Sequence, residues 1–207
     1  AQQAVALATV VEAHGASNPA VLYMTNDYGS GLGDNFATNW SGTVCTQVGY
    51  DPTEGSYDAS TLAQAVIDGG CDSVLLMSYA TDGAAIIEAL SSQGFTGQIF
   101  GADGLADLKF TVSFTDVAAV DGLVATRPRP GNKSHITSKF DMQYKKAGGV
   151  EGGIYTYETY DAINIAASAI ASDPEGDIVA ALNKIGNSYV GASGSITFDA
   201  NGDVLDT

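Results

Sequence analysis

The sequence predicts an α/β protein whose first part is a doubly wound, parallel five-stranded sheet flanked by helices. Two observations carry this prediction: short apolar runs recur along residues 1–126, and helical patterns separate most of them. A third concerns the rest of the chain, where three helical patterns follow a segment rich in proline without strands between them. The chain of 207 residues, 45% hydrophobic, is long enough for one large domain or two small lobes.

The apolar runs predict the strands. Residues 19–25 (PAVLYMT) are nearly continuous in apolar side chains, which is typical of a strand covered on both faces. Similar runs occupy residues 43–50, 73–79, 98–104 and 122–126, and an amphipathic pattern over residues 1–15 precedes them all. Helical patterns at 32–41, 60–68 and 82–92 separate the first four runs, so right-handed crossovers and the strand order 2-1-3-4-5 are expected.

The pattern changes after residue 126. Residues 127–134 (RPRPGNKS) predict a hinge or crossover. Helices are expected at 136–147, 155–171 and 175–185, the last entered through Asp173 as N-cap and Pro174 at the first helical position. Residues 194–207 alternate as a strand, an Asn-Gly turn and a return strand. No strand accompanies the three helices, so their apolar faces need a partner that the sequence does not contain.

Charge and composition exclude several classes of function. Eight Lys and Arg against 24 Asp and Glu give a net charge of -16, which repels nucleic acid and anionic bilayers. No apolar run approaches the roughly 20 residues that span a membrane, and the first fifteen residues show no signal-peptide pattern. Cys45 and Cys71 fit either one disulfide or two thiols. With two distant histidines they are too few for a metal site.

The glycine-rich segment TNDYGSGLGDNF (residues 25–36) resembles a phosphate loop only superficially. Asp34 stands where the third glycine of a dinucleotide fingerprint belongs, and no Gly-Lys-Ser/Thr triplet follows. A tight strand-to-helix connection, with glycines at positive φ and Ser30 as helix cap, is the structural interpretation. A doubly wound enzyme that uses a nucleotide therefore stays only as a remote alternative.

Ligands of doubly wound sheets bind beyond the carboxyl ends of the strands, and this rule selects a candidate site. Asp27 and Tyr28 follow the first strand, Tyr79 follows the third, and Asp103 follows the fourth. In the order 2-1-3-4-5 these strands are neighbours, so two aromatic walls and a carboxylate would share one rim. Such a rim suits a small ligand with a positive group. The alternative is local packing of both tyrosines, with Asp103 capping a helix near Ala106.

Catalysis finds no support in the motifs. No G-x-S-x-G elbow occurs, and neither histidine lies near a candidate nucleophile. The acidic pairs Asp72 with Asp82, and Asp199 with Asp203, fall at expected strand starts or turns, where solvation is the usual explanation. Residues 199–203 (DANGD) lack the glycine offset and glutamate of a calcium loop and predict a hairpin turn. We expect neither enzymatic activity nor a cofactor.

Several segments together resemble the type I periplasmic substrate-binding proteins of ABC transporters, in the branched-chain amino acid (leucine/isoleucine/valine-binding) family. The similarity spans nearly the whole chain in family order. Its carriers are AVLYMTNDYGSGLGDNF, VGYDPTEGSYDAS (48–60), CDSVLLMSYATDGAAIIEALSSQGF (71–95), IFGADGL (99–105), YTYETYDAINIAASAI (155–170) and GSITFDANGD (194–203).

The resemblance implies two α/β lobes joined by a hinge and closing on an amino acid or similar small ligand. Residues 1–126 then correspond to the second lobe, 127–134 to the hinge or crossover, and 135–190 to helices that pack on the first lobe. Residues 191–207 return to the second lobe. The family's N-terminal lobe has no counterpart here, so a fragment is expected. Such a protein is exported, to the periplasm or cell exterior, and delivers its ligand to an ABC permease; a receptor or regulator with the same fold is the alternative.

The resemblance also assigns residues. Tyr28, Tyr79 and Asp103 match ligand contacts of the second lobe: the carboxylate holds the ligand's α-ammonium and the tyrosines wall its body. The groups that grip the α-carboxylate belong to the first lobe. Asp103 is one methylene shorter than the glutamate of some relatives, which leaves the ligand's identity open. Export to an oxidising compartment also makes a disulfide between Cys45 and Cys71 reasonable.

Overall fold

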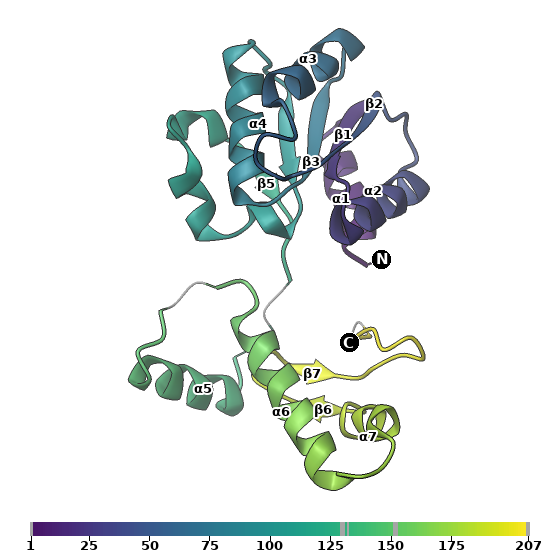
Figure 1. Ribbon diagram of the computed structural model, residues 1–207, viewed down its shortest axis with the longest axis vertical. Helices are drawn as coiled ribbons and strands as arrows, with labels where there is room; N and C mark the ends of the chain where they lie inside the picture. The colour runs from purple at the N-terminus through teal and green to yellow at the C-terminus, as the bar shows by residue number, and fades with distance from the viewer. Residues whose placement is uncertain (1, 129–130, 132, 151–152, 206–207) are drawn as a thin grey trace. The chain divides into compact units, whose positions relative to one another are not determined.

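Two units, residues 1–127 and 128–207, make up the computed structural model (Figure 1). The structure describes residues 2–128, 131, 133–150 and 153–205. Each unit has its own secondary structure and its own buried residues and is described by itself. Part of the proline-rich segment expected at 127–134, namely residues 129, 130 and 132, lies outside the described residues.

A parallel five-stranded sheet organises the first unit, in the order β2-β1-β3-β4-β5, as predicted. Leu22 in the middle of β1 pairs with Val48 of β2 on one side and with Leu76 of β3 on the other. The strands are β1 (Pro19–Met24), β2 (Thr46–Tyr50), β3 (Ser73–Met77), β4 (Gln98–Gly101) and β5 (Val124–Ala125). The helices are α1 (Gln2–Ala13), α2 (Asp27–Asn39), α3 (Ala59–Gly69) and α4 (Ala80–Ser92), with 3-10 turns at Asp103–Leu105, Leu108–Ser113 and Val117–Val120.

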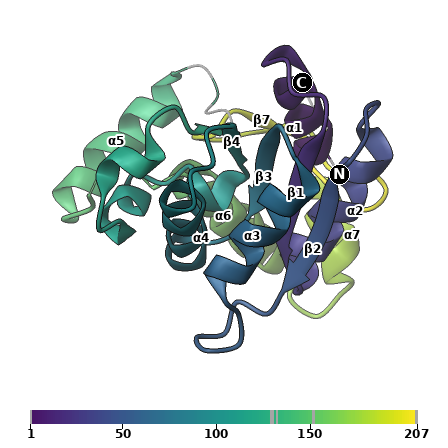
Figure 2. The same cartoon turned by 90° about the horizontal axis from the view of Figure 1, so that it is seen from above.

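Both faces of this sheet are covered, which explains why its central strands are apolar at successive positions. Every residue of β3 is buried. Leu76 points into a core shared with α3 and α4, while Leu75 points into a second core shared with α1 and α2. The view from above shows the two helix pairs on opposite sides of the central strands (Figure 2). The sheet therefore exposes its strand ends rather than its faces.

A disulfide joins Cys45 and Cys71, with 5.5 Å between their Cα atoms, and confirms the pairing that the family resemblance implied. Both cysteines sit near the amino end of β1: the backbone N–H of Cys45 donates to the Pro19 carbonyl, and that of Asp72 donates to the Asn18 carbonyl. The last residue of α3, Gly69, passes the bridge so closely that an added Cβ would lie 3.0 Å from the Cys45 sulfur. The bridge thus fastens α3 to the strand β2.

The second unit contains three helices and a short strand pair. The helices are α5 (His135–Lys146), α6 (Thr156–Ser172) and α7 (Ile178–Ile185), and the strands β6 (Tyr189–Val190) and β7 (Ser195–Ile196) are antiparallel. Strand β7 lies in the strand predicted from residue 194 onward, whereas β6 was not predicted. The start of α7 was also misplaced, because its N-cap is Asp177, which accepts from the N–H groups of Val179 and Ala180. The predicted hairpin turn at 199–203 is confirmed by a Phe198–Val204 bridge.

A fully buried carboxylate organises the second unit. Asp161, on α6, has 0% exposure and accepts hydrogen bonds from the backbone N–H of Ala192 at 2.8 Å and of Ser193 at 2.7 Å, with the Ser193 hydroxyl at 2.6 Å. These donors lie in the turn between β6 and β7. Gly191, next to them, leaves room for the carboxylate, which any Cβ there would overlap. Asp161 therefore fixes the strand pair to α6.

The end of the chain contributes β7 to the pair with β6. The assignment of residues 191–207 to the lobe formed by residues 1–126, and of 135–190 to a surface on another lobe, stays a prediction. None of the described helices has the length and hydropathy that a membrane span requires.

Candidate ligand site at the carboxyl ends of the strands

Tyr28 is held at the end of β1 by a helix that begins at once. Asn26 caps α2, its side chain accepting from the Gly29 N–H at 2.9 Å, so Tyr28 is the second helical residue. Gly29 is required here because a Cβ would overlap the carbonyl oxygen of Met24. The glycines at 29, 31 and 33 lie inside the helix without positive φ, so the expected glycine turn capped by Ser30 was wrong.

Tyr79 stacks on Tyr28 from the end of the neighbouring strand. Their ring centroids are 5.4 Å apart and the ring planes differ by 14°, within the range of favourable aromatic pairs. Tyr79 is the N-cap residue of α4, makes no side-chain cap hydrogen bond and is 50% exposed. Half of the Tyr79 side chain is therefore open to solvent.

Asp103 completes the group from the end of β4. The Tyr28 hydroxyl donates to its Oδ1 at 2.8 Å, and the backbone N–H of Gly104 lies 3.4 Å from the same hydroxyl. Asp103 is 8% exposed and begins the 3-10 turn Asp103–Leu105, whose N-cap is Ala102. Capping a helix near Ala106 is therefore not what Asp103 does. The structure brings Tyr28, Tyr79 and Asp103 together, as the strand-end rule predicted.

Asp27 does not join them. It lies in the first turn of α2 with an exposed side chain, where a carboxylate favourably meets the positive end of the helix dipole. The stacking and the hydrogen bonds that unite the other three residues do not include it. Asp27 therefore contributes only its negative charge to the surroundings of the candidate site.

A second group of polar residues, which the sequence interpretation missed, lies behind Tyr79. The Tyr50 hydroxyl, at the end of β2, lies 2.6 Å from Ser78 Oγ and also donates to the carboxylate of Asp82. Asp82 is 5% exposed, so the expectation that it is a solvated surface acid was wrong. Tyr50 ends a predicted strand, so the strand-end rule points to Tyr50 itself but not to its partners Ser78 and Asp82.

Burial shapes the proton chemistry of this group. Desolvation raises the pKa of Asp82 above its ordinary 3.8, even though the hydrogen bond from Tyr50 opposes the rise. Burial also raises the pKa of Tyr50, and the hydrogen bond to the Asp82 carboxylate adds to this. Tyr50 therefore stays protonated at any physiological pH, and its hydroxyl donates a hydrogen bond to Asp82.

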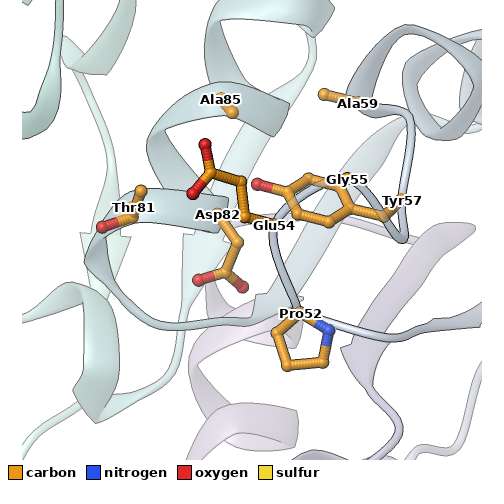
Figure 3. Close-up of a pocket in the computed structure, with 8 residues that line it drawn as sticks. All are labelled: Pro52, Glu54, Gly55, Tyr57, Ala59, Thr81, Asp82 and Ala85. Carbon is orange, nitrogen blue, oxygen red and sulfur yellow. The ribbon is translucent and has the colours of Figure 1, made fainter.

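Asp82 also lines a hollow of about 450 Å³ beside the candidate site (Figure 3). Its walls come from the connection after β2 and from the first turns of α4. The lining residues are Pro52, Glu54, Gly55, Tyr57, Ala59, Thr81, Asp82 and Ala85. Among the residues that the structure describes, no group of three or more His, Cys, Asp or Glu is arranged to hold a metal ion.

The match to a family model decides what this architecture is. The model, described as periplasmic binding protein, matches residues 1–206. The chain belongs to the periplasmic binding protein family. Its members include solute-binding proteins, so a solute-binding role is the general function that the family supports. No curated protein matches the chain.

Solved structures agree with the fold. A leucine-binding protein LivK from Thermotoga maritima is 26% identical, with a TM-score of 0.81, and the match covers 99% of this chain and 59% of that one. The substrate-binding protein LivJ of a branched-chain amino acid transporter from Streptococcus pneumoniae, in complex with isoleucine, is 17% identical, with a TM-score of 0.75 and coverage of 99% and 59%.

A third structure widens the range of ligands among such folds. It is a solute-binding protein of an ABC transporter from R. palustris in complex with 4-hydroxybenzoate, 14% identical, with a TM-score of 0.76 and coverage of 96% of this chain and 56% of that one. The chain thus spans about 60% of the length of the structures it matches.

Proposed function

We propose that the chain is part of the solute-binding component of an ABC importer and captures a small amino-acid-like ligand between two lobes. In this proposal the first unit supplies one jaw, and the N-terminal lobe of the family supplies the other. The observation that carries the proposal is the joint placement of Tyr28, Tyr79 and Asp103 on one rim. Delivery to a permease and export to the periplasm or cell exterior follow from the same family relationship, and the disulfide fits an oxidising compartment.

The chemistry of the rim favours an ammonium over a carboxylate. Asp103 is largely buried beside the Tyr28 hydroxyl, and an ion pair is stronger at such a site than in open solvent. The exposed Asp27 and the net charge of -16 add to the negative potential. A benzoate-like anion would meet repulsion at this jaw unless its carboxylate pointed away. An amino acid can place its ammonium on Asp103 and direct its carboxylate away from this jaw, toward the other lobe.

Exposed apolar side chains of the second unit support the proposal that a partner lobe packs on it. Large apolar side chains on α6 and α7 are more than half exposed: Ile163, Ile170 and Val179. Exposed apolar side chains of this size are unusual on helices whose outer faces are normally polar. We propose that these helices pack on the first lobe, and that the divisions at 126/127, 134/135 and 190/191 separate second lobe, hinge, helices and return segment.

The same fold could serve as the ligand-sensing domain of a receptor or regulator. The site chemistry would be unchanged, so the residues do not separate the two roles. A gene that encodes a signalling or DNA-binding domain next to this segment would favour the sensor, and one that lies beside ABC permease genes would favour transport.

Calorimetric titration with leucine, N-acetyl-leucine and benzoate tests the ligand class. Leucine should bind weakly, in the millimolar range, since only about half of the contacts are present. N-acetyl-leucine and benzoate, which lack the ammonium, should not bind. Asp103→Asn should abolish the leucine signal, whereas Asp121→Asn, which removes an exposed carboxylate of the same unit, should leave it unchanged.

Two results would contradict the proposal. Equal binding of leucine and N-acetyl-leucine would show that Asp103 does not bind the ligand's ammonium. Micromolar affinity of this chain for leucine would show that a second jaw is not needed.

A further inference from the structure

A buried hydrogen-bond network grips the backbone on both sides of Tyr79. Ser78, which precedes Tyr79, is 0% exposed, and its Oγ lies 2.6 Å from the Tyr50 hydroxyl. Asp82, three residues beyond Tyr79 in the first turn of α4, accepts from the same hydroxyl. The Tyr79 side chain itself makes no cap hydrogen bond and is half exposed. Its direction therefore depends on the backbone that carries it and on the stack with Tyr28.

We propose that Tyr50, Ser78 and Asp82 are positioning residues, which fix the ring of Tyr79 against Tyr28 and so shape the wall of the ligand site. That Tyr79 contacts a ligand rests on the proposed function, while the orientation of its ring does not. The hydroxyl of Tyr50 reaches both partners from β2, on the far side of β1 from β3. The network therefore ties the edge of the sheet to the centre of the site.

The same backbone turn also touches the segment that carries Asp103. Gly104 passes the Ser78 carbonyl so closely that a Cβ there would overlap its oxygen. A shift of Ser78 toward Gly104 would therefore displace Gly104, which is next to the carboxylate that accepts from Tyr28. Through this contact the network reaches two of the three ligand-site residues without touching a ligand itself.

The protonation of Asp82 sets the direction of the hydrogen bonds. An ionised carboxylate only accepts, so the Tyr50 hydroxyl donates to it, and the Ser78 hydroxyl must donate to the Tyr50 oxygen. A protonated Asp82 can instead donate to the Tyr50 oxygen, which frees the phenolic proton for Ser78. Protonation of Asp82 thus reverses the donor and acceptor roles along the chain of hydrogen bonds from Asp82 through Tyr50 to Ser78.

The hollow beside α4 gives protons a route to this carboxylate (Figure 3). The titratable groups that face Asp82 are Tyr50 from β2, and Glu54 and Tyr57 from the connection that follows it. Desolvation already raises the pKa of Asp82, so its proton is taken up at a higher pH than by an exposed aspartate.

Tyrosine ring NMR signals of the chain test the proposal without ligand. Stacked rings shift each other's signals, so the signals of Tyr79 and Tyr28 report their mutual orientation. Ser78→Ala and Tyr50→Phe should both move them. The matched control is Ser73→Ala, which removes a buried serine hydroxyl at the opposite end of the same strand. Ring signals unchanged in both network variants, or moved equally in the control, would overturn the proposal.

A pH titration separates positioning from general destabilisation. The Tyr79 signals should titrate with a midpoint above 3.8, the ordinary value of an aspartate, and Asp82→Asn should remove this step. A midpoint that is unchanged by the substitution would contradict the role of Asp82.

Leucine titration then connects the network to binding. Ser78→Ala should weaken leucine binding up to about tenfold, the equivalent of one net hydrogen bond, while Ser73→Ala should not. Equal affinities of Ser78→Ala and the unsubstituted chain would contradict the role of the network in shaping the site. Failure of leucine to bind the unsubstituted chain would count against the proposed function alone, since the ring signals would still decide whether the network positions Tyr79.

Discussion

Removal of the Cys45–Cys71 disulfide should cost the first unit a large part of its stability. The bridge joins residues 26 apart. A loop of this length restricts the unfolded chain by an amount equivalent to about 3.5 kcal/mol at 25 °C on the chain-entropy model. Both cysteines are partly exposed, so their replacement by alanine adds little for a lost core contact. A domain of ordinary stability has only about 5–15 kcal/mol in total.

The double variant Cys45→Ala/Cys71→Ala is the appropriate perturbation, compared with the oxidised chain in urea and thermal unfolding. The unfolding entropy of a unit of this size is about 0.27 kcal/mol per kelvin near 60 °C, so the melting temperature should fall by about 10–15 °C. Hydrogen exchange of the Gly191 amide, bonded within the second unit, provides an internal reference that should not change. A loss below about 1 kcal/mol would refute the reasoning, because the loop length would then not govern the effect.

Three further predictions concern single residues. Gly104→Ala should destabilise the first unit by about 1–3 kcal/mol in urea unfolding, since the new Cβ overlaps the Ser78 carbonyl; Gly31→Ala, with open space around it inside a helix, should be neutral or stabilising, and equal losses would refute the close approach. Asp161→Asn should destabilise the second unit by about 2 kcal/mol, because an amide cannot accept all three hydrogen bonds, and preserved exchange protection of β6 would contradict this. The pKa of Asp72 is lowered because the four hydrogen bonds that it accepts outweigh the effect of burial. Its stabilising contribution is therefore present above pH 3.8 and lost as the pH falls through the lower folded value, and Asp72→Asn should flatten this loss in urea midpoints measured between pH 5 and pH 2.

The order of the sheet could be predicted because buried parallel strands leave a strong pattern. All five residues of β3 (SVLLM) are apolar or small and all are buried, so the sequence shows the strand and its coverage together. The grouping of three candidate site residues followed from the same logic, since parallel strands bring their carboxyl ends to one edge. That edge holds Tyr28, Tyr79 and Asp103 in contact.

Element boundaries and buried polar contacts depended on tertiary structure and were missed. Helix α2 begins at Asp27 although it contains three glycines, because Gly29 packs against the Met24 carbonyl and no larger residue would fit. Strand β6 has only two residues, and the turn that follows it is held by Asp161, a contact that no local pattern reveals. Asp82 was expected in solvent because its sequence neighbours give no sign that Tyr50, 32 residues away, would cover it.

The most direct test of the central claim is a leucine titration followed on the ring signals of the chain's ten tyrosines. If the rim is a jaw for an amino-acid-like ligand, the signals of Tyr28 and Tyr79 move together and saturate in the millimolar range, and N-acetyl-leucine at the same concentration leaves them in place. Movement of Tyr57 at the hollow with Tyr28 and Tyr79 unchanged, or an equal response to the acetylated compound, would contradict the assignment of the site and of its ammonium contact.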